Sequence, residues 1–249
     1  MQSNILVGYT GFVGQTLDKS IDFEYKFNSK NLSEISEVPE GCNLYLSCLP
    51  ATKWMVNKNL KADMHNMYSI LEEISAKSYK NVYLISTIDI YGSSPLHSDE
   101  DYAPNYEGMS YGSNRLLFEA MVKEYVCCEN LQIFRLPALF GEGLKKNVIF
   151  DLMNNNQVDK INLNTHFQWY DMADLAMDLD AYSQDVVNLF PEPVYTKDIV
   201  DTLFPEVGLT NMGNKMIYDF KTKHTSSGYI YDSATSLKKI KAFVQWNLE

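Results

Sequence analysis

The sequence predicts an α/β fold in which helices cover both faces of a doubly wound parallel sheet. Two features of the 249-residue chain lead to this prediction. Short apolar segments alternate with amphipathic segments of helical period through the first half, and the first apolar segment runs directly into a turn with three glycines. Strands that alternate with helices are joined by right-handed crossovers, which make the sheet parallel. Such sheets bind ligands beyond the carboxyl ends of their strands, so the functional residues are expected at that edge.

The expected strands are short apolar runs that end at polar or glycine residues, and they cover residues 4–8, 23–27, 43–48, 81–86 and 131–135. The first helix is expected over residues 12–17. A longer helix is expected over residues 56–77, because apolar side chains recur there at steps of three and four: Leu60, Met64, Met67, Leu71 and Ile74.

The regular alternation of strand-like and helix-like segments is weaker in the second half, where short apolar segments are separated by glycine and asparagine residues. We therefore expect a sheet domain over residues 1–140 and a small C-terminal lobe over residues 141–249. Residues 168–190 are expected to return to the first domain. Within the lobe, residues 215–220 are expected to form a strand and residues 236–246 a final helix.

Composition disfavours several classes of protein. The chain carries 21 Lys+Arg against 32 Asp+Glu, a formal net charge of -11, which opposes binding to nucleic acid or to an anionic membrane surface. No run of about 18 apolar residues is present, so we expect a cytoplasmic protein without a membrane span. The cysteines lack metal-binding spacing, and no metal site is expected; Cys127 and Cys128 are expected side by side on a helix. The acidic run at residues 98–101 is expected in a solvated loop.

The glycine turn lies between the first expected strand and the first expected helix, with the spacing GxxGxxG. A tight turn, a close approach of backbone and tight helix-to-strand packing each require a missing Cβ. Backbone N–H groups at the helix start could then hold the diphosphate of a dinucleotide. The expected cofactor-binding residues of this turn are Gly8, Tyr9, Thr10, Gly11, Phe12, Val13 and Gly14. An ordinary glycine-rich turn is the alternative.

The residues after the second expected strand bear on the choice of dinucleotide. Asn28, Ser29 and Lys30 include no acid that could accept the ribose 2′-OH of NAD. Lys30 suits the 2′-phosphate of NADP, so NADP is the preferred cofactor and NAD the alternative. A Lys30 that is simply solvated is nearly as compatible with the sequence.

A pair of hydroxyl residues, Ser86 and Thr87, closes the fourth expected strand, and Tyr111 opens a later helix. Arg115 follows Tyr111 by four residues and therefore lies on the same face of that helix. A phenol with a pKa near ~10 needs a fixed cation nearby to exchange protons at neutral pH. Arg115 can supply that charge.

The order of the motifs resembles that of the extended short-chain dehydrogenase/reductases, the NAD-dependent epimerase/dehydratase family. The segments that carry the resemblance are the glycine turn, residues 86–92 (STIDIYG), residues 111–115 (YGSNR) with Glu119 following, and residues 135–141 (RLPALFG). Residues 169–176 and 187–189 are similar to downstream landmarks of that family. The resemblance implies a Rossmann domain for a dinucleotide and a C-terminal lobe for the substrate.

The resemblance also implies roles for single residues. Tyr111 would be the catalytic acid/base, Thr87 would orient the substrate oxygen, with Ser86 the weaker candidate, and Asn66 would support the water network of the site. Further cofactor contacts implied by the resemblance are Cys48, Leu49, Pro50, Pro137 and Leu139. The family box is YxxxK, and this chain departs from it with YxxxR. Arg115 keeps the charge of the lysine but differs from it in length, planarity and hydration.

The function implied by the resemblance is that of an NAD(P)-dependent oxidoreductase or epimerase acting on a hydroxyl or keto carbon of a sugar, carried on a nucleotide. Asn147 and His166 are the expected substrate contacts, and a helix-start cap is the alternative for Asn147. Dehydration ranks lower, because Ile88 rather than an acid follows Thr87. A homodimer is the family expectation. The alternative function is a catalytically degenerate, dinucleotide-binding regulator or scaffold, which the arginine of the YxxxR box motivates.

Overall fold

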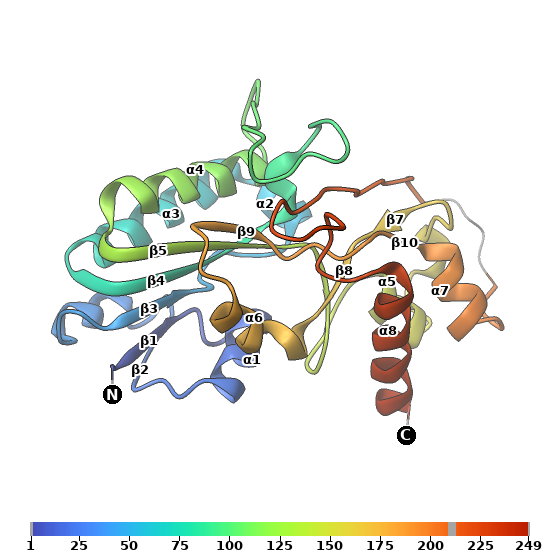
Figure 1. The fold of residues 1–249 in the computed structure, drawn as a ribbon, viewed down its shortest axis with the longest axis horizontal. Helices are drawn as coiled ribbons and strands as arrows, with labels where there is room; N and C mark the ends of the chain where they lie inside the picture. Colours follow the sequence, from blue (N-terminus) through green and yellow to red (C-terminus); the bar gives the residue numbers. More distant parts are fainter. Residues whose placement is uncertain (1, 209–212, 249) are drawn as a thin grey trace. The chain divides into compact units, whose positions relative to one another are not determined.

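The computed structural model describes residues 2–208 and 213–248 (Figure 1). The chain divides into two compact units. Unit 1 contains Met1–Ser94, Tyr102–Arg135 and Leu175–Val187; unit 2 contains Pro95–Asp101, Leu136–Asp174 and Asn188–Glu249. Each unit buries an apolar core of its own.

A six-stranded parallel sheet flanked by helices dominates unit 1 and confirms the predicted fold class. Its spatial order is β2-β1-β3-β4-β5-β9, with bounds β1 (Asn4–Val7), β2 (Tyr25–Phe27), β3 (Asn43–Leu46), β4 (Ser78–Thr87), β5 (Cys127–Leu136) and β9 (Val186–Asn188). The register sets Ile5 of β1 beside Tyr25 and Leu44. Because the chain leaves β1 toward β2 on one side and reaches β3 on the other, the strand order reverses at β1. The carboxyl end of that strand is where such sheets bind ligands.

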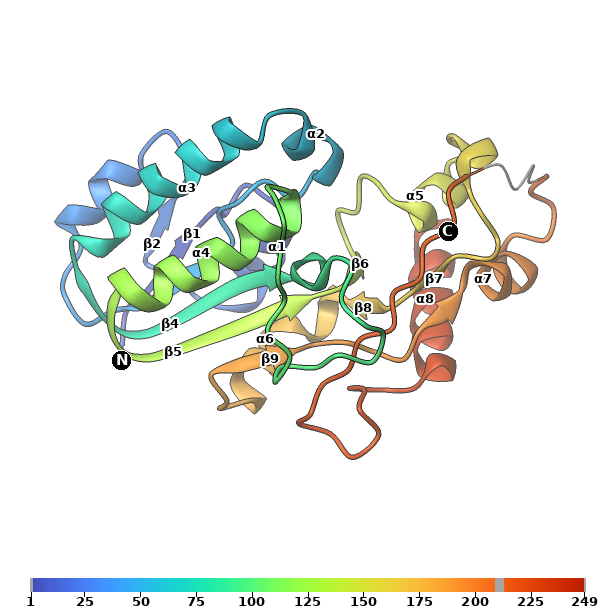
Figure 2. The same cartoon turned by 90° about the horizontal axis from the view of Figure 1, so that it is seen from above.

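Helices cover both faces of this sheet. α3 (Leu60–Ser75) and α4 (Tyr111–Tyr125) lie side by side on one face, and α1 (Phe12–Ser20) and α6 (Leu175–Ala181) lie on the other (Figures 1 and 2). Two 3₁₀ helices, η1 (Leu32–Glu37) and η2 (Ile88–Tyr91), follow β2 and β4. The core between α3, α4 and the sheet buries Leu44, Met67 and Phe118 among others. Each such side chain stabilises the fold by about 1.5–3 kcal/mol through burial.

The single helix predicted over residues 56–77 is wrong, because the chain forms two helices there. α2 (Lys53–Lys58) ends before Asn59, and α3 begins after it. Asn59 has φ -147° and ψ 69°, outside the helical region, and its side chain accepts a hydrogen bond of 3.1 Å from the Ala62 N–H. Such a cap competes with continued helix, and apolar spacing alone does not detect it.

Unit 2 contains two pairs of short strands. β6 (Ala138–Phe140) pairs in parallel with β8 (Trp169–Asp171), and β7 (His166–Phe167) pairs antiparallel with β10 (Val194–Tyr195). The helices of this unit are α5 (Val148–Met153), α7 (Thr196–Leu203) and α8 (Ser233–Leu248), with 3₁₀ helices η3 (Val158–Lys160) and η4 (Met172–Asp174). Phe140, Trp169 and Ile240 lie in its core.

Two further predictions about secondary structure are wrong. Among the described residues, the segment 215–220 forms no strand; it makes an isolated bridge between Ile217 and His166. Cys127 and Cys128 begin β5 instead of lying on a helix. The helix-forming pattern of α4 runs up to Tyr125, and only the extended backbone of the C-cap Val126 marks the change.

The predicted solvent exposure of residues 98–101 is wrong for Glu100, whose side chain is 2% exposed. Its carboxylate accepts hydrogen bonds from the backbone N–H groups of Asn188 (2.7 Å) and Lys223 (2.9 Å) and from the Thr222 hydroxyl (2.7 Å). These partners are distant in sequence, so the local acidic composition gave no sign of them.

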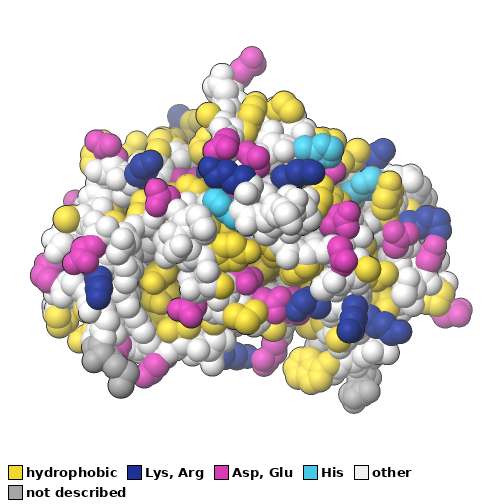
Figure 3. Space-filling view, in the orientation of Figure 1, with side chains coloured by type: hydrophobic (Ala, Val, Ile, Leu, Met, Phe, Trp, Pro, Cys, Tyr) yellow, Lys and Arg dark blue, Asp and Glu magenta, His cyan; other side chains and the backbone are white. Residues whose placement is uncertain are grey.

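In the part of the chain that the structure describes, every helix is too short or too polar to cross a membrane. The face shown in Figure 3 carries Asp and Glu side chains interspersed with Lys and Arg side chains.

Candidate active site

The glycine turn between β1 and α1 adopts a backbone shape that requires glycine at two positions. Gly8 has φ +95°, and a Cβ added there would lie 2.4 Å from the carbonyl oxygen of Ser47. A Cβ added to Gly14 would lie 2.1 Å from the carbonyl oxygen of Gly8. Both distances are far below van der Waals contact, so the turn packs backbone against backbone on both sides.

The start of α1 is the part of this turn that suits an anion. Gly11 is the N-cap and no side chain caps the first N–H groups, and the first turn of the helix holds no acidic residue. Uncapped N–H groups at the positive end of a helix dipole bind phosphate well. The turn therefore fits the diphosphate of a dinucleotide, which residues 8–14 would hold.

The end of β2 lies beside this turn. Asn28 Nδ2 donates a hydrogen bond of 3.0 Å to the hydroxyl of Tyr9, and the Lys30 N–H donates one of 2.8 Å to Asn28 Oδ1. Ser29 and Lys30 are exposed. Asn28 therefore contacts the glycine turn, whereas the Lys30 side chain is exposed to solvent.

Thr87 and Ser86, at the end of β4, have different surroundings. The Thr87 Oγ1 accepts a hydrogen bond of 3.2 Å from the Asp89 N–H at the start of η2. The Ser86 hydroxyl donates to the buried carboxylate of Glu119. Because Ser86 is committed to that carboxylate, Thr87 is the better placed of the two to meet a ligand, as the sequence predicts.

Tyr111 begins α4, and the local sequence fixes its backbone. Ser110 and Ser113 form a reciprocal capping box at the helix start, and the Tyr111 N–H donates a hydrogen bond of 2.8 Å to Asn57 Oδ1 of α2. The side chains of Thr87 and Arg115 lie close enough to its phenol to lower its pKa. The structure therefore brings together all three residues predicted to carry the chemistry.

Arg115 lowers the pKa of Tyr111 as expected, but the net shift of that pKa is upward. Burial raises the pKa of Tyr111, and this effect outweighs the lowering by the Arg115 charge; the carboxylate of Asp89 raises it further. Tyr111 is 6% exposed, and burial disfavours the charged phenolate.

Arg115 itself is committed to an acid that the sequence reasoning missed. Its guanidinium pairs with Asp63 of α3, with Nη1 2.8 Å from Oδ2, and its carbon atom Cζ lies 4.5 Å from the centre of the Tyr111 ring. Asp63 shares the buried face of α3 with Met67 and Ile70. A carboxylate at an apolar position of a helix was the available signal, since a buried charge requires a partner.

The segment after β3 is tied to this group. The carbonyl oxygen of Pro50 accepts a hydrogen bond of 2.8 Å from Arg115 Nη2, and burial raises the pKa of the Cys48 thiol to about 12. Cys48 and Leu49 are half-buried and Pro50 is exposed. These three predicted cofactor contacts therefore follow the strand next to β1.

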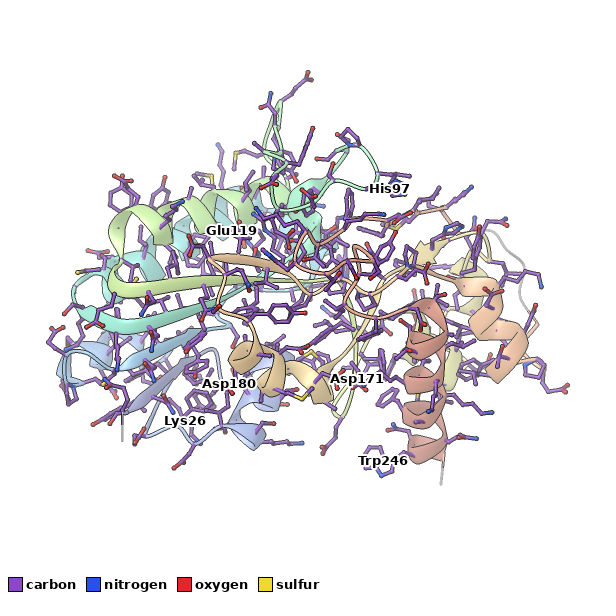
Figure 4. The ribbon with its side chains drawn as sticks, viewed as in Figure 1. Lys26, His97, Glu119, Asp171, Asp180 and Trp246 are labelled. Atoms are coloured by element: carbon purple, nitrogen blue, oxygen red, sulfur yellow. The ribbon has the colours of Figure 1, made fainter. Side chains whose placement is uncertain are left out.

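Beneath these residues, Glu119 extends from α4 toward the sheet (Figure 4) and pairs with Arg135 of β5. Both side chains are buried. The sequence places Glu119 and Arg135 in the family-like motifs, but it does not indicate that they bind each other.

The remaining predicted site residues belong to unit 2. Pro137 lies between β5 and β6, and Leu139 lies on β6. Asn147 caps α5: its Oδ1 accepts from the Phe150 N–H at 3.1 Å, and its Nδ2 donates to the Leu139 carbonyl oxygen at 2.7 Å. The alternative of a helix-start cap is therefore realised at Asn147.

His166 is half-buried on β7, and its ring centre lies 3.7 Å from that of Tyr195. Burial lowers the pKa of His166. A neutral imidazole can both donate and accept hydrogen bonds. Over residues 2–208 and 213–248, no group of three or more His, Cys, Asp or Glu side chains could hold a metal ion.

Comparison with known proteins gives a match in structure. No family model matches the sequence, and no curated protein matches it. A solved structure of MoeE5 in complex with UDP-glucuronic acid and NAD is similar over 99% of each chain, with a TM-score of 0.73 and 15% identity. A variant of UDP-glucuronic acid 4-epimerase from Bacillus cereus is similar over 100% of each chain, with a TM-score of 0.74 and 14% identity. A dTDP-4-dehydrorhamnose reductase from Clostridium acetobutylicum is similar over 100% of each chain, with a TM-score of 0.72 and 12% identity. The chain therefore shares the fold of these three structures.

Proposed function

We propose that this protein is an NAD(P)-dependent oxidoreductase or epimerase that acts on a hydroxyl or keto carbon of a nucleotide-linked sugar. The observation that carries the proposal is the proximity of the Tyr111 phenol to the Thr87 side chain at the carboxyl end of β4, close enough for Thr87 to lower the pKa of Tyr111. Because β1, β3 and β4 run parallel, these two side chains lie at the same edge of the sheet as the glycine turn. A proton-exchanging phenol and an orienting hydroxyl at the edge that holds a dinucleotide are what hydride chemistry at a carbinol carbon requires.

The dinucleotide, when bound, supplies hydride transfer to or from the substrate carbon. The chain supplies binding and proton transfer. Backbone N–H groups of residues 8–14 hold the diphosphate, and Cys48, Leu49 and Pro50 flank it. Thr87 and Tyr111 hydrogen-bond the substrate oxygen, and Tyr111 gives that oxygen a proton or takes one from it.

For the cofactor we favour NADP. None of residues 28–31, directly after β2, is acidic, and Lys30 is exposed there. An acid at this point would repel the 2′-phosphate of NADP. NAD is the alternative, and the MoeE5 and Bacillus cereus structures were both solved with NAD. Within unit 2, Pro137 and Leu139 are the proposed contacts of the nicotinamide.

A nucleotide-linked sugar is supported as the substrate class by the similar MoeE5 structures, which hold UDP-glucuronic acid and UDP-glucose. We assign its recognition to Asn147 and His166 of unit 2. The Asn147 amide already bonds two backbone groups, so its contact to a substrate would use the second lone pair of its oxygen.

A second candidate function is a dinucleotide-binding regulator without turnover. The observation that favours it is the ion pair between Arg115 and Asp63. Arg115 is the cation expected to assist Tyr111, and its charge is paired with the Asp63 carboxylate. In that case the glycine turn would still bind a dinucleotide, and Tyr111 would have no chemical task.

The experiment that tests the proposal has two stages. Titration of the purified protein with NAD and with NADP establishes binding. Absorbance of the reduced dinucleotide then reports net oxidation or reduction of a panel of keto and hydroxyl nucleotide sugars, and NMR of the products reports epimerisation, which leaves the dinucleotide unchanged. We expect Tyr111→Phe to bind the dinucleotide normally and to lose about 10²- to 10⁴-fold in kcat. Tyr102→Phe, at an exposed tyrosine in the segment before α4, is the matched control. Binding without turnover in the wild type, across the whole panel, would favour the regulator.

We also propose a homodimer that pairs α3 and α4 with those of a second copy. Tyr68, Leu117 and Tyr125 on these helices are 52%, 38% and 60% exposed, and Tyr68 and Tyr125 line an open hollow together with Leu71, Glu72 and Ser75. Large exposed apolar groups on adjacent helices favour association. Sedimentation of Tyr125→Lys should then report a monomer, whereas Trp246→Lys, at an exposed residue of α8, should leave the dimer intact.

A further inference from the structure

Arg115 and Asp63 form a two-point ion pair that is closed to solvent. Arg115 Nη1 lies 2.8 Å from Asp63 Oδ2, and Nη2 lies 3.0 Å from Oδ1. The two side chains are 5% and 2% exposed. A guanidinium and a carboxylate in this arrangement fix each other's plane as well as their separation.

Other groups hold both members in place. Asn114 Nδ2 donates to Asp63 Oδ2 at 2.8 Å, and Arg115 Nη2 also donates to the carbonyl oxygen of Pro50 at 2.8 Å. The guanidinium is thereby fixed over the Tyr111 ring, with its Cζ 4.5 Å from the ring centre. The pair links α3, α4 and the segment after β3.

The two charges that act on Tyr111, those of Arg115 and Asp89, are each paired with an opposite charge. From α4 and α3 come Arg115 and Asp63, which pair with each other. From η2 comes Asp89, which pairs with Lys53 of α2 at 2.6 Å. The other polar neighbours are the Thr87 hydroxyl of β4 and the Asn57 side chain of α2, and the Cys48 thiol after β3 is uncharged. The charges of Arg115 and Lys53 are balanced by those of Asp63 and Asp89. The four groups therefore carry no net positive charge that would stabilise a Tyr111 phenolate.

We propose that Asp63 is a positioning residue that cancels the charge of Arg115 and so keeps Tyr111 a neutral phenol, a proton donor for a substrate carbonyl. This inference rests on the proposed function and gives it a direction. In the reductive step the carbonyl carbon accepts a hydride from the reduced dinucleotide, the carbonyl oxygen accepts the Tyr111 proton, and the tyrosinate then takes a proton from water. The preferred substrate is accordingly a keto sugar rather than its alcohol.

The proposal can be tested on the protein without added dinucleotide. The tyrosinate absorbance of the wild type minus that of Tyr111→Phe, followed against pH, isolates the titration of Tyr111. We expect the midpoint of Tyr111 in the wild type to lie above that of an ordinary tyrosine, because burial raises its pKa. In Asp63→Asn, compared with Asp63→Asn/Tyr111→Phe, the unpaired Arg115 charge should lower the midpoint by at least about one pH unit, a tenfold rise in tyrosinate at a given pH. Asp63→Glu should restore the wild-type midpoint.

Glu119→Gln is the matched control, because it neutralises a buried carboxylate paired with arginine on the same helix as Tyr111. It should leave the midpoint of Tyr111 unchanged. A wild-type midpoint near neutral pH, or an Asp63→Asn midpoint equal to that of the wild type, overturns the proposal. If Asp63→Asn does not fold, the double variant Asp63→Asn/Arg115→Gln decides. It removes both charges together, so its midpoint should equal that of the wild type, and a raised midpoint overturns the proposal.

This test separates the inference from the proposed function. The tyrosinate titration needs neither substrate nor turnover, so its failure leaves the enzyme assignment standing. Absence of turnover with a normal titration would instead remove the enzyme assignment. When turnover is found, Asp63→Asn should lose reductive kcat above about pH 8, where the wild type keeps it.

Discussion

Glu119 of α4 and Arg135 of β5 form a buried ion pair with two contacts: Arg135 Nη2 lies 2.7 Å from Glu119 Oε2, and Nε lies 3.1 Å from Oε1. Arg135 Nη1 also donates to the Tyr91 hydroxyl at 3.1 Å, and the Ser86 hydroxyl donates to the same carboxylate. The pair therefore ties the helix that begins with Tyr111 to the two strands beneath it.

Glu119→Gln should destabilise the protein by about 3–5 kcal/mol, because it leaves the Arg135 charge buried without a carboxylate. Urea denaturation gives the free energy of unfolding. Asp201→Asn, which breaks the exposed pair with Lys197, should change it by less than about 1 kcal/mol. Equal effects of the two variants would contradict a structural role for the buried pair.

Gly14→Ala should abolish dinucleotide binding while the protein remains folded enough to purify. The added Cβ would lie 2.1 Å from the Gly8 carbonyl oxygen, so the turn or the start of α1 must move. Gly108→Ala is the control, since nothing lies within 4 Å of a Cβ at Gly108. Equilibrium titration with both dinucleotides measures the loss, and unchanged binding by Gly14→Ala would remove this turn from the cofactor site.

The glycine turn and the hydroxyl pair could be predicted from sequence because local chain geometry dictates them. Gly8 and Gly14 are required by contacts within the turn and with the adjacent strand, and the capping box at Ser110 fixes where α4 starts and hence where Tyr111 lies. The position of Thr87 could be predicted because it is the last residue of the apolar strand β4. Each of these placements depends on a short stretch of chain.

The partners of these residues could not be predicted, because they come from elsewhere in the sequence. Asp63 lies 52 positions before Arg115, and Glu100 bonds the backbone at Asn188 and Lys223. Helical periodicity places Asp63 on the apolar face of α3, but it does not indicate which residue pairs with it. Asn59 ended a helix that the apolar spacing continued, because a side-chain cap depends on conformation rather than on hydrophobic pattern.

Lys30→Asp should change the preference between dinucleotides. A carboxylate at this exposed position after β2 would accept the ribose 2′-OH of NAD and repel the 2′-phosphate of NADP. We expect the ratio of the two dissociation constants to move toward NAD by at least about tenfold, or about 1.4 kcal/mol. Lys80→Asp, at an exposed residue near the start of β4, is the control for the change in net charge. A ratio that is the same in Lys30→Asp and wild type would exclude Lys30 from the cofactor site.

Glu100→Gln should destabilise unit 2 by about 2–4 kcal/mol. Its carboxylate accepts hydrogen bonds from two backbone N–H groups and the Thr222 hydroxyl, and such charge-assisted bonds contribute about 1.5–3 kcal/mol each. The amide keeps one acceptor oxygen, so only part of this is lost. Hydrogen exchange at the Asn188 and Lys223 amides locates the effect. Asp101→Asn, at a side chain 73% exposed, should leave both amides protected.

Stability should fall at alkaline pH because buried tyrosines must ionise on unfolding. Burial raises the pKa of Tyr45, Tyr79 and Tyr111 above their ordinary value. The unfolded chain therefore loses these protons first, and the stability that the neutral phenols confer is complete below about pH 10 and declines as pH rises above it. Each of the three contributes up to about 1.4 kcal/mol per pH unit in that range.

Urea denaturation between about pH 8 and about pH 11 measures the slope of the free energy of unfolding against pH. Tyr79→Phe should reduce the slope by about a third of the part these residues contribute, even though it loses the hydrogen bond to Ile74, whereas Tyr125→Phe, at an exposed side chain, should leave it unchanged. A slope that Tyr79→Phe does not alter would show that its ionisation is not linked to unfolding.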